Sequence, residues 1–330
     1  MSARLYLVQS KNVFHLLKPD PKYSTRFKLQ NQLFESTPLK LSIKSLIILV
    51  VLCVKNDTSK YTFIFHQQAS LPYLIIFKVL LFWKNLNCIY DIHDINEINS
   101  AKTLQLKIRN SILYILEFIV FNLNVSVITV SKGLSKIYYQ RYGKSPDVIS
   151  NIPCIDTSMT CCNVDAKKRL VYFGLIYEDR LPLDSLDEIF ACGYTLDLYG
   201  VWASDSCKKY IESSKYFKNG TIKMCGKYSS DNLDFLNNYN YLLFHVPHSN
   251  SLNYRYCLPN KLFQAIQYRL PIISSSNLFE MNLKFPSWTI KLNELLYSST
   301  VEKVIDYNKT IKRYEKLRLD TKEQFLRVLK

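Results

Sequence analysis

The sequence predicts an α/β protein built around parallel sheets. Short runs of β-branched and aromatic residues alternate with longer segments of helical apolar spacing along almost the whole chain, which is the order typical of parallel strands connected by helices. The 330 residues are enough for two domains of ordinary size. A hydrophobic content of 48% with 21% charged residues indicates a globular chain and excludes an intrinsically disordered one.

The formal net charge of +16 is unevenly distributed. Residues 1–150 hold 19 Lys and Arg against 8 Asp and Glu, a balance of +11, and residues 151–330 hold 24 against 19, a balance of +5. A basic first half favours an anionic partner: a membrane surface, a lipid phosphate or a nucleic acid. The basic residues are scattered through both halves without a recognition motif, so we expect no nucleic-acid binding.

Cysteine usage and the apolar runs indicate where the chain works. The nine cysteines show no paired Cys-x-x-Cys spacing, which predicts free thiols in a reducing cytoplasm and neither a disulfide framework nor a zinc site. Residues 1–12 lack the pattern of a signal peptide. The runs 45–54 and 71–83 are shorter than the ~20 residues that span a bilayer, so we expect core elements there and no transmembrane span. The alternative is an apolar, basic face that rests on a membrane surface.

The first half alternates predicted strands and helices. Strands are expected at residues 4–9, 61–66, 88–92, 125–130 and 147–150. Helices are expected at residues 22–36, 41–55, 71–83, 101–122 and 132–142. Ser131 is the predicted N-cap of the last of these helices and Gly143 its end.

The strand at residues 88–92 runs directly into His93 and Asp94. In a parallel α/β sheet, ligands bind beyond the carboxyl ends of the strands. A histidine there can hydrogen-bond a substrate hydroxyl or phosphate, or act as a general acid or base. An ordinary loop histidine beside a carboxylate is the alternative.

A second α/β domain is expected after a linker at residues 154–168. Strands are predicted at residues 169–173, 195–200, 222–225, 241–247, 272–273 and 288–292. Helices are predicted at residues 183–192, 229–239, 259–270, 293–307 and 310–329. We expect Gly174 to end the first of these strands and to let the backbone approach a ligand closely, while Arg180 can pair with a diphosphate. The pattern is not Gly-x-Gly-x-x-Gly, so it disfavours a dinucleotide fold of the dehydrogenase type.

Residues 253–276 read as loop, helix and strand. Pro259 stands where the helix begins, a position that tolerates its missing N–H. The N-terminus of a helix offers free N–H groups and partial positive charge to a phosphate, and Lys261 adds a full charge. Gln264 can hydrogen-bond a sugar hydroxyl. The alternative is an ordinary helix with a proline start.

This segment resembles the donor-site helix of GT-B glycosyltransferases, in particular the family 4-like enzymes of bacterial capsule and lipopolysaccharide assembly. The matching residues are Asn253, Tyr254, Pro259, Asn260, Lys261, Leu262 and Phe263. The sequence Asp91-Ile-His-Asp94 is similar to a motif that faces the cleft in the same family, and Glu117 resembles a glutamate common at its place. The resemblance implies two Rossmann-like domains with a cleft between them. It also implies that His93 and Asp94 are catalytic and that the donor is bound by Gly174, Arg180, Asn253, Tyr254, Asn260, Lys261 and Gln264.

Three positions depart from the family pattern. The helix glutamate of the family is Gln264 here, a second glutamate is replaced by Tyr256, and a glycine is replaced by Arg269. These departures keep two alternatives open: a nucleotide-sugar 2-epimerase of the same architecture, and a catalytically inactive scaffold in polysaccharide assembly.

The resemblance implies an acceptor domain at residues 1–153, a donor domain at 154–310 and a C-terminal helix at 311–330 that packs back on the first domain. We expect a metal-independent, retaining hexosyltransferase without a cofactor. Its partners would be a nucleotide-sugar donor and a saccharide acceptor, the latter lipid-linked. It would act in surface polysaccharide synthesis in the cytoplasm, with peripheral contact at the inner membrane face.

Overall fold

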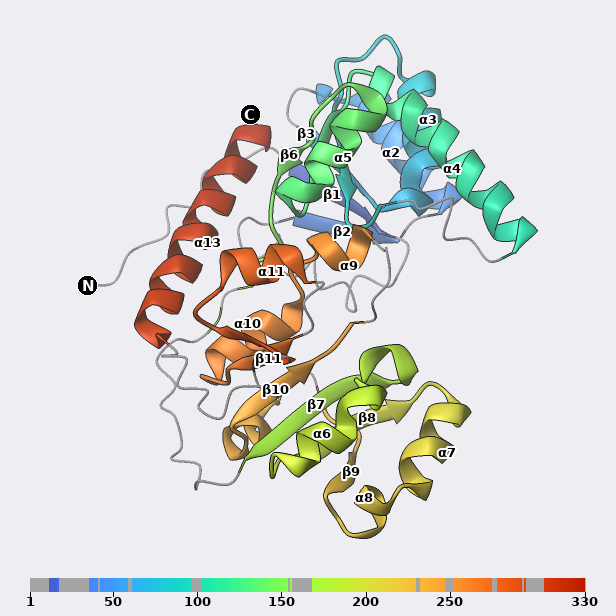
Figure 1. The fold of residues 1–330 in the computed structure, drawn as a ribbon. Coiled ribbons are helices and arrows are strands. Elements are labelled where there is room, and N and C mark those ends of the chain that lie inside the picture. The colour runs from blue at the N-terminus through green and yellow to red at the C-terminus, as the bar shows by residue number, and fades with distance from the viewer. Residues whose placement is uncertain are drawn as a thin grey trace. The chain divides into compact units, whose positions relative to one another are not determined.

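The fold consists of two compact units, each built on its own parallel sheet (Figure 1). The computed structural model describes residues 12–17, 36–40, 42–58, 61–95, 103–153, 155, 168–229, 232–246, 252–274, 278–292, 294 and 306–329. The first unit comprises Met1–Cys154, Ser251–Asn253 and Leu317–Lys330, and the second comprises Ile155–Asn250 and Tyr254–Lys316.

The first unit holds a six-stranded sheet in the order β2-β1-β3-β4-β5-β6, with every neighbouring pair parallel. Its strands are β1 (Asn12–Leu17), β2 (Ser36–Lys40), β3 (Tyr61–His66), β4 (Asn87–Ile92), β5 (Ser126–Thr129) and β6 (Asp147–Val148). Its helices are α2 (Ile43–Lys55), α3 (Leu71–Leu80), α4 (Leu104–Asn122), α5 (Lys132–Tyr142) and the C-terminal part of α13 (Tyr307–Leu329).

Both faces of the first sheet are covered, and successive strand side chains point to opposite faces. Phe63 of β3 packs edge-on against Phe77 of α3. The opposite face is covered from α13 by Phe325, which packs in one cluster with Ile64 and Ile89. Because strand side chains alternate between faces, α3 and the C-terminal part of α13 lie on opposite sides of this sheet.

The second unit holds a six-stranded parallel sheet in the order β12-β11-β10-β7-β8-β9. Its strands are β7 (Arg169–Ile176), β8 (Thr195–Trp202), β9 (Ile222–Gly226), β10 (Tyr241–Phe244), β11 (Ile272–Ser274) and β12 (Thr289–Lys291). Its connections include the 3₁₀ turns η5 (Glu178–Arg180), η6 (Leu183–Ser185) and η7 (Asp234–Asn238) and the helices α6 (Leu186–Ala191), α7 (Asp205–Ser213), α8 (Lys215–Lys218), α10 (Asn260–Gln267) and α11 (Phe279–Lys284). Helix α9 (Leu252–Tyr256) is divided between the two units after Asn253.

Most predicted elements are confirmed, including the capping of α5. Its N-cap Ser131 accepts a hydrogen bond from the backbone N–H of Leu134, and Gly143 ends the helix in the left-handed region. Strands β1 and β2 and helices α7, α8, α9 and α11 were not predicted. The predicted strand 4–9, most of helix 22–36 and nearly all of helix 293–307 lie outside the described residues, although Ser36 begins β2.

Two predictions were wrong for clear physical reasons. The predicted helix 229–239 is replaced by the short 3₁₀ turn η7, before which the Asn232 side chain accepts a hydrogen bond from the backbone N–H of Asp234. Such local bonds compete with helix formation. Strands β7 and β8 do not end at Gly174 and Gly200 but continue to Ile176 and Trp202, with the two glycines paired in register.

The apolar runs 45–54 and 71–83 fall within α2 and around α3. Leu49 and Phe77 are buried core residues, as expected, but other apolar side chains of both runs are exposed, including Val51 and Trp83. The expectation of core elements is therefore only partly correct. Among the described residues, no helix is long and apolar enough to cross a bilayer.

Candidate functional site

A cavity of about 420 Å³ opens at the carboxyl ends of the second sheet. It lies at the ends of β7 and β10 and at the start of α10, and its size suits a small-molecule ligand. Five of the predicted donor-binding residues line it: Gly174, Arg180, Asn260, Lys261 and Gln264. Its lining contains no carboxylate among the residues that the structure describes.

Lys261 lies in the first turn of α10 and points its ammonium group into an aromatic environment. The Nζ atom lies 4.4 Å from the ring centroid of Tyr172, 5.0 Å from that of Phe173 and 5.7 Å from that of Phe244. Burial and, secondly, the nearby Arg180 guanidinium lower the pKa of Lys261 to about 7. When protonated, Lys261 is a cation to which the described cavity lining offers no carboxylate, which is the electrostatic condition for binding an anion.

Gly174 leaves the space in which this ammonium group sits, and Gly200 leaves the space that the Gly174 backbone occupies. Gly174 has φ +132°, and a Cβ there would lie 2.8 Å from the Lys261 Nζ atom. Gly200 has φ +143°, and a Cβ there would lie 1.8 Å from the carbonyl oxygen of Gly174. The paired glycines thus allow β7 and β8 to continue past the cavity while the backbone forms part of its wall.

Arg180, at the end of η5, is held by two tyrosines. Its Nε atom donates to the Tyr177 hydroxyl (2.7 Å) and its Nη2 atom donates to the Tyr254 hydroxyl (3.3 Å). The guanidinium carbon also lies 4.9 Å from the ring centroid of Tyr254. Tyr254, a predicted donor residue that does not line the cavity, therefore acts here on the orientation of Arg180.

The loop that carries Arg180 is anchored at its other end by Glu178. This carboxylate accepts hydrogen bonds from the hydroxyls of Ser204 and Ser206, at the start of α7. The same two hydrogen bonds lower the pKa of Glu178 to about 2. The loop after β7 is thereby attached to the loop after β8, which restricts the positions that Arg180 can take.

Asn260 offers the cavity a second polar group, the Oδ1 acceptor of its side chain. Its Oδ1 atom is buried and makes no hydrogen bond with any described residue. A buried acceptor without a partner costs free energy and is rare in native structures. A hydroxyl or amide donor on a ligand in the cavity would satisfy it. Gln264 lies one turn further along α10 and lines the same cavity.

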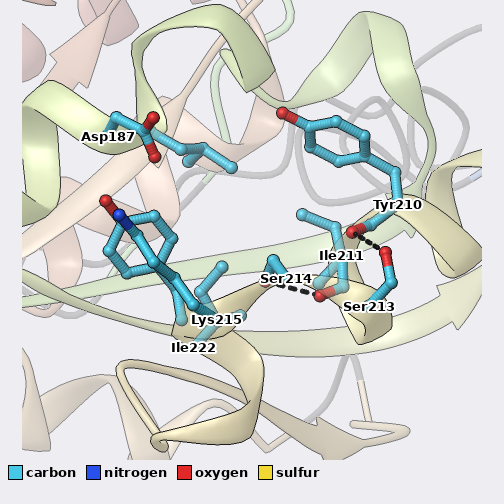
Figure 2. A pocket seen from close by; sticks show the side chains of 9 residues that line it. Asp187, Tyr210, Ile211, Ser213, Ser214, Lys215 and Ile222 are labelled. Atoms are coloured by element: carbon cyan, nitrogen blue, oxygen red, sulfur yellow. Dashed lines mark hydrogen bonds between the residues drawn. The ribbon is translucent and has the colours of Figure 1, made fainter.

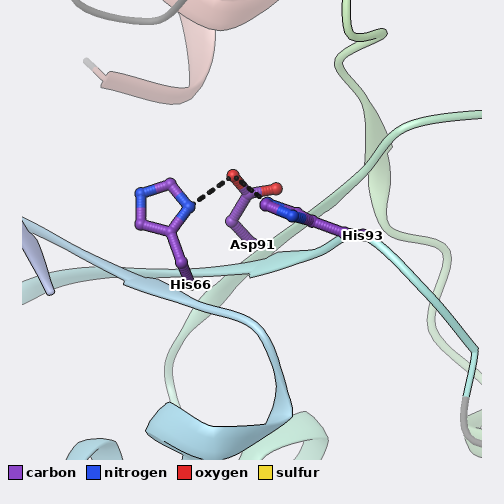
Figure 3. A group of neighbouring side chains, drawn as sticks. All are labelled: His66, Asp91 and His93. Carbon is purple, nitrogen blue, oxygen red and sulfur yellow. Dashed lines mark ion pairs between the residues drawn. The ribbon is translucent and has the colours of Figure 1, made fainter. Parts of the chain in front are cut away.

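In the first unit, His93 belongs to a cluster with His66 and Asp91 (Figure 3). The Asp91 Oδ2 atom lies 3.0 Å from Nδ1 of His66 and 3.3 Å from Nε2 of His93. His66 and Asp91 are fully buried and paired in register at the carboxyl ends of β3 and β4, whereas His93 is partly exposed. The cluster thus places a partly accessible imidazole on a buried carboxylate.

The contact with Gln67 indicates the tautomer of His93. The Gln67 Nε2 atom can only donate, so the His93 Nδ1 atom 3.3 Å away is the acceptor, and the ring proton lies on Nε2, which faces Asp91. Gln67 has φ +62°, an uncommon conformation for a residue other than glycine. Since that contact is exposed, Nδ1 is the ring nitrogen that a substrate can reach.

Two histidines and a carboxylate could also hold a divalent cation, since the three ligand atoms lie within 4.8 Å of one another. With the three residues alone, the contacts are ion pairs that bring both rings to one oxygen atom of Asp91.

Two predicted site residues lie apart from these clusters. Asp94 is exposed, and its backbone carbonyl accepts a hydrogen bond from the Tyr138 hydroxyl (3.5 Å). Asn253 belongs to the first unit, where its side-chain amide accepts from the backbone N–H of Ile95 (2.6 Å) and donates to the carbonyl of Ile95 (3.1 Å). The structure thus gives Asn253 a role in holding the chain that follows β4.

Glu117 on α4 is fully buried and is surrounded by hydroxyl groups. It accepts hydrogen bonds from Tyr142 (3.0 Å), Tyr138 (3.3 Å) and Tyr90 (3.4 Å). Burial raises the pKa of Glu117, and the tyrosine hydrogen bonds only partly oppose this effect. The cluster ties α4 and α5 to β4 and therefore has a structural role.

A smaller cavity of about 270 Å³ lies among α6, α7, α8 and the start of β9 (Figure 2). Ser213 donates to the carbonyl of Tyr210 (3.1 Å) and Ser214 donates to that of Ile211 (2.7 Å). Ile222, the first residue of β9, marks the amino end of the sheet, away from the strand ends at which ligands bind in α/β folds. We assign no function to this smaller cavity.

Comparison with protein-family models and with curated proteins gives no match for this sequence. Solved structures are similar in fold at low sequence identity. The N-terminal domain of trehalose-6-phosphate phosphatase from Candida albicans has a TM-score of 0.63 at 10% identity, covering 97% of each chain. Sucrose-phosphate synthase from Thermosynechococcus elongatus has a TM-score of 0.57 at 12% identity, covering 96% of each chain.

A UDP-forming α,α-trehalose-phosphate synthase from Burkholderia vietnamiensis has a TM-score of 0.56 at 8% identity, over 87% of this chain and 78% of the other. At such identities these likenesses establish the fold and leave the activity open. The predicted fold class is confirmed: the chain has the GT-B architecture, with two Rossmann-like units that each contain a six-stranded parallel sheet.

Proposed function

We propose that this protein is a glycosyltransferase that takes its sugar from a nucleotide-sugar donor bound in the cavity of the second unit. The observation that carries the proposal is the buried Lys261 ammonium group, which shares an acid-free cavity with Arg180 at the N-terminus of α10. Two cations and a helix N-terminus suit the diphosphate of the donor. Negative charge grows on that diphosphate as the glycosidic bond breaks, so the same groups would stabilise the transition state without a metal ion.

The remaining cavity residues suit the other parts of such a donor. Asn260 and Gln264 offer amides to sugar or ribose hydroxyls, and Gly174 permits close approach of the backbone. Asn253 and Tyr254 would act indirectly, by holding the adjoining chain and by orienting Arg180. Retention of the anomeric configuration stays a proposal that derives from the family resemblance alone.

The first unit would bind the acceptor, with His93 as the residue that meets the reacting groups. Its Nδ1 atom is the accessible acceptor, and the Asp91 carboxylate, 3.3 Å from its Nε2 atom, would favour the matching tautomer. Asp94 would serve as a polar neighbour. We propose a saccharide acceptor that is lipid-linked, as in surface polysaccharide synthesis. The synthases of similar fold are named for sugar phosphates, which makes a soluble sugar phosphate the competing acceptor.

The first test is a thermal-shift panel of UDP, GDP, CMP, dTDP and their sugars with the purified chain. A ligand at about 100 times its dissociation constant adds about 2.7 kcal/mol to the stability of the native state. We expect one nucleotide to stabilise the wild type and Lys261→Met to abolish the shift. Lys168→Met is the matched control, because Lys168 also lies over a tyrosine ring, Tyr194 at 5.2 Å, but outside the cavity.

The nucleotide that binds identifies the sugar donors to be used in the activity assay. Release of nucleoside diphosphate only when a lipid-linked saccharide or a sugar phosphate is added supports transfer and identifies the acceptor class. Conversion of the donor to its sugar epimer without any acceptor would indicate the 2-epimerase instead. Failure of every nucleotide to shift the melting curve at millimolar concentration would refute donor binding and favour the scaffold.

A further inference from the structure

Three neighbouring helices of the first unit expose apolar side chains on their outward surface. Helices α2, α3 and α4 lie side by side over one sheet (Figure 1). Their exposed apolar residues, here called the apolar helical face, are 46–61% exposed at six representative positions: Ile47, Val51, Val79, Trp83, Ile112 and Ile115. Trp83 lies in the turn that follows α3, and the others lie on the three helices.

The core of the first unit does not need these side chains. Each helix already buries an inner row, represented by Leu49 of α2, Phe77 of α3 and Phe121 of α4. The helices are therefore apolar on the inner and the outer side, a pattern typical of helices that are covered on both. Soluble monomers rarely expose apolar patches larger than a few hundred Å², so such a face indicates an interaction surface.

Charge on the same helices indicates what covers the face. Within α2, α3 and α4 the only carboxylate is Glu117, which is buried, whereas the basic residues Lys44, Lys55, Lys107 and Arg109 are exposed. A second copy of this chain would bring like charges together, which opposes a symmetric dimer through this face. Anionic lipid headgroups complement it instead.

We propose that the apolar helical face docks on a membrane that contains anionic phospholipid. The helices lie in the plane of the membrane, with their outer apolar side chains at the boundary between headgroups and acyl chains and their Lys and Arg side chains on lipid phosphates. Trp83 and the adjacent Phe82 are 60% and 79% exposed, and aromatic side chains favour this boundary. None of the three helices is long and apolar enough to cross the bilayer.

This inference deepens the proposed function, since it rests on that proposal for the lipid-linked acceptor that a docked first unit would meet. The exposed face itself does not depend on which sugar is transferred. Docking and donor binding use different units and different residues, so one can fail without the other.

The test is sedimentation of the full chain with vesicles of phosphatidylcholine alone and of phosphatidylcholine mixed with phosphatidylglycerol. We expect strong binding to the anionic vesicles that weakens at high salt. The double variant Lys107→Gln with Arg109→Gln should bind them about 30-fold more weakly, at about fivefold per charge. Binding to neutral vesicles should not change.

The apolar contribution is tested with a matched pair of double variants. Ile112→Ser with Ile115→Ser removes two side chains of the face that are 53% and 58% exposed, and binding should fall by about tenfold or more. Leu283→Ser with Leu319→Ser is the control, because both leucines are 58% exposed but lie on α11 and α13. Vesicles should also shift the tryptophan emission to the blue, and Trp83→Phe should remove that shift.

Three results would overturn the proposal. The first is no binding to anionic vesicles by a chain that still shows its nucleotide-dependent thermal shift. The second is equal loss of binding in the control variant. The third is a dimer in light scattering that Ile112→Ser with Ile115→Ser dissociates, which would assign the face to a second copy. The nucleotide shift, measured on every variant, reports separately on folding and on donor binding.

Discussion

Replacing Lys261 with methionine should stabilise the ligand-free protein while destroying its anion site. Lysine ordinarily has a pKa of 10.5, and burial followed by the Arg180 charge lowers that of Lys261 to about 7. At 1.36 kcal/mol per pH unit, holding the charged form in the folded protein costs about 5 kcal/mol at pH 6. Methionine fills similar space without charge, and a volume-conserving exchange costs up to about 1.5 kcal/mol in packing, so Lys261→Met should gain about 3 kcal/mol near pH 6.

The sign of the pH dependence gives a second check on Lys261. A lysine whose pKa is lower in the folded state destabilises the protein most below the folded pKa. That penalty disappears as the pH rises from about 7 to the unfolded value. Wild-type stability should therefore rise relative to Lys261→Met across this window, and the two should converge near pH 10.5.

Urea unfolding of both proteins at several pH values, followed by circular dichroism, measures this difference. Lys168→Met serves as the control, since Lys168 is exposed and its removal should leave the wild-type pH profile unchanged. If Lys261→Met were less stable than the wild type at pH 6 and followed a parallel pH profile, the buried cation would be a structural contact. The reasoning from desolvation would then be refuted.

Three further predictions concern other parts of the molecule. Gly200→Ala should destabilise the second unit by about 3 kcal/mol or more in urea unfolding, because its methyl group would lie 1.8 Å from a backbone carbonyl oxygen; a smaller loss would mean that the β7–β8 pair relaxes easily. Asp91→Asn should lower the turnover of the proposed transferase at least about tenfold and shift its pH profile, with nucleotide affinity unchanged, because His93 would lose the carboxylate that lies 3.3 Å from its Nε2 atom. An unchanged pH profile would contradict a role of Asp91 in proton transfer. Burial raises the pKa of Glu117 in the folded state, so the wild type should lose stability as the pH rises above 4.5 and the buried carboxyl group is forced to ionise. Glu117→Gln should abolish this loss, and a variant that still lost stability with rising pH would show that another group causes it.

The fold was largely predictable because hydrophobic periodicity reports directly on parallel strands and their helices. The strand at residues 61–66 was predicted with the bounds of β3 because its aromatic and β-branched residues form one short run, and the structure buries five of the six. The end of β7 was misplaced because glycine usually terminates a strand. Whether Gly174 does so depends on Gly200, its neighbour on β8, which local sequence does not reveal.

The site was only partly predictable, for a similar reason. The sequence identifies Lys261 and Arg180 as cations near strand and helix ends, but the aromatic rings around Lys261 come from β7 and β10 and meet it only in the fold. His66 was not selected and Asp91 was noted only as part of the motif that ends in Asp94, although each lies at the carboxyl end of a predicted strand. Their pairing depends on the register between β3 and β4, which strand patterns alone do not fix.

The departure from the family pattern at Gln264 can now be compared with the structure of the cavity. A glutamate at position 264, three residues from Lys261 on the same helix, would face the same cavity and supply a carboxylate to the ammonium group. With glutamine there, the described cavity lining has no acid and Lys261 is held without a counterion. In an inactive scaffold, a buried Lys261 charge would destabilise the fold without any benefit, so the lysine could be replaced. In a donor site, the same unpaired charge attracts an anionic ligand. The glutamine at position 264 therefore favours anion binding over an inactive protein.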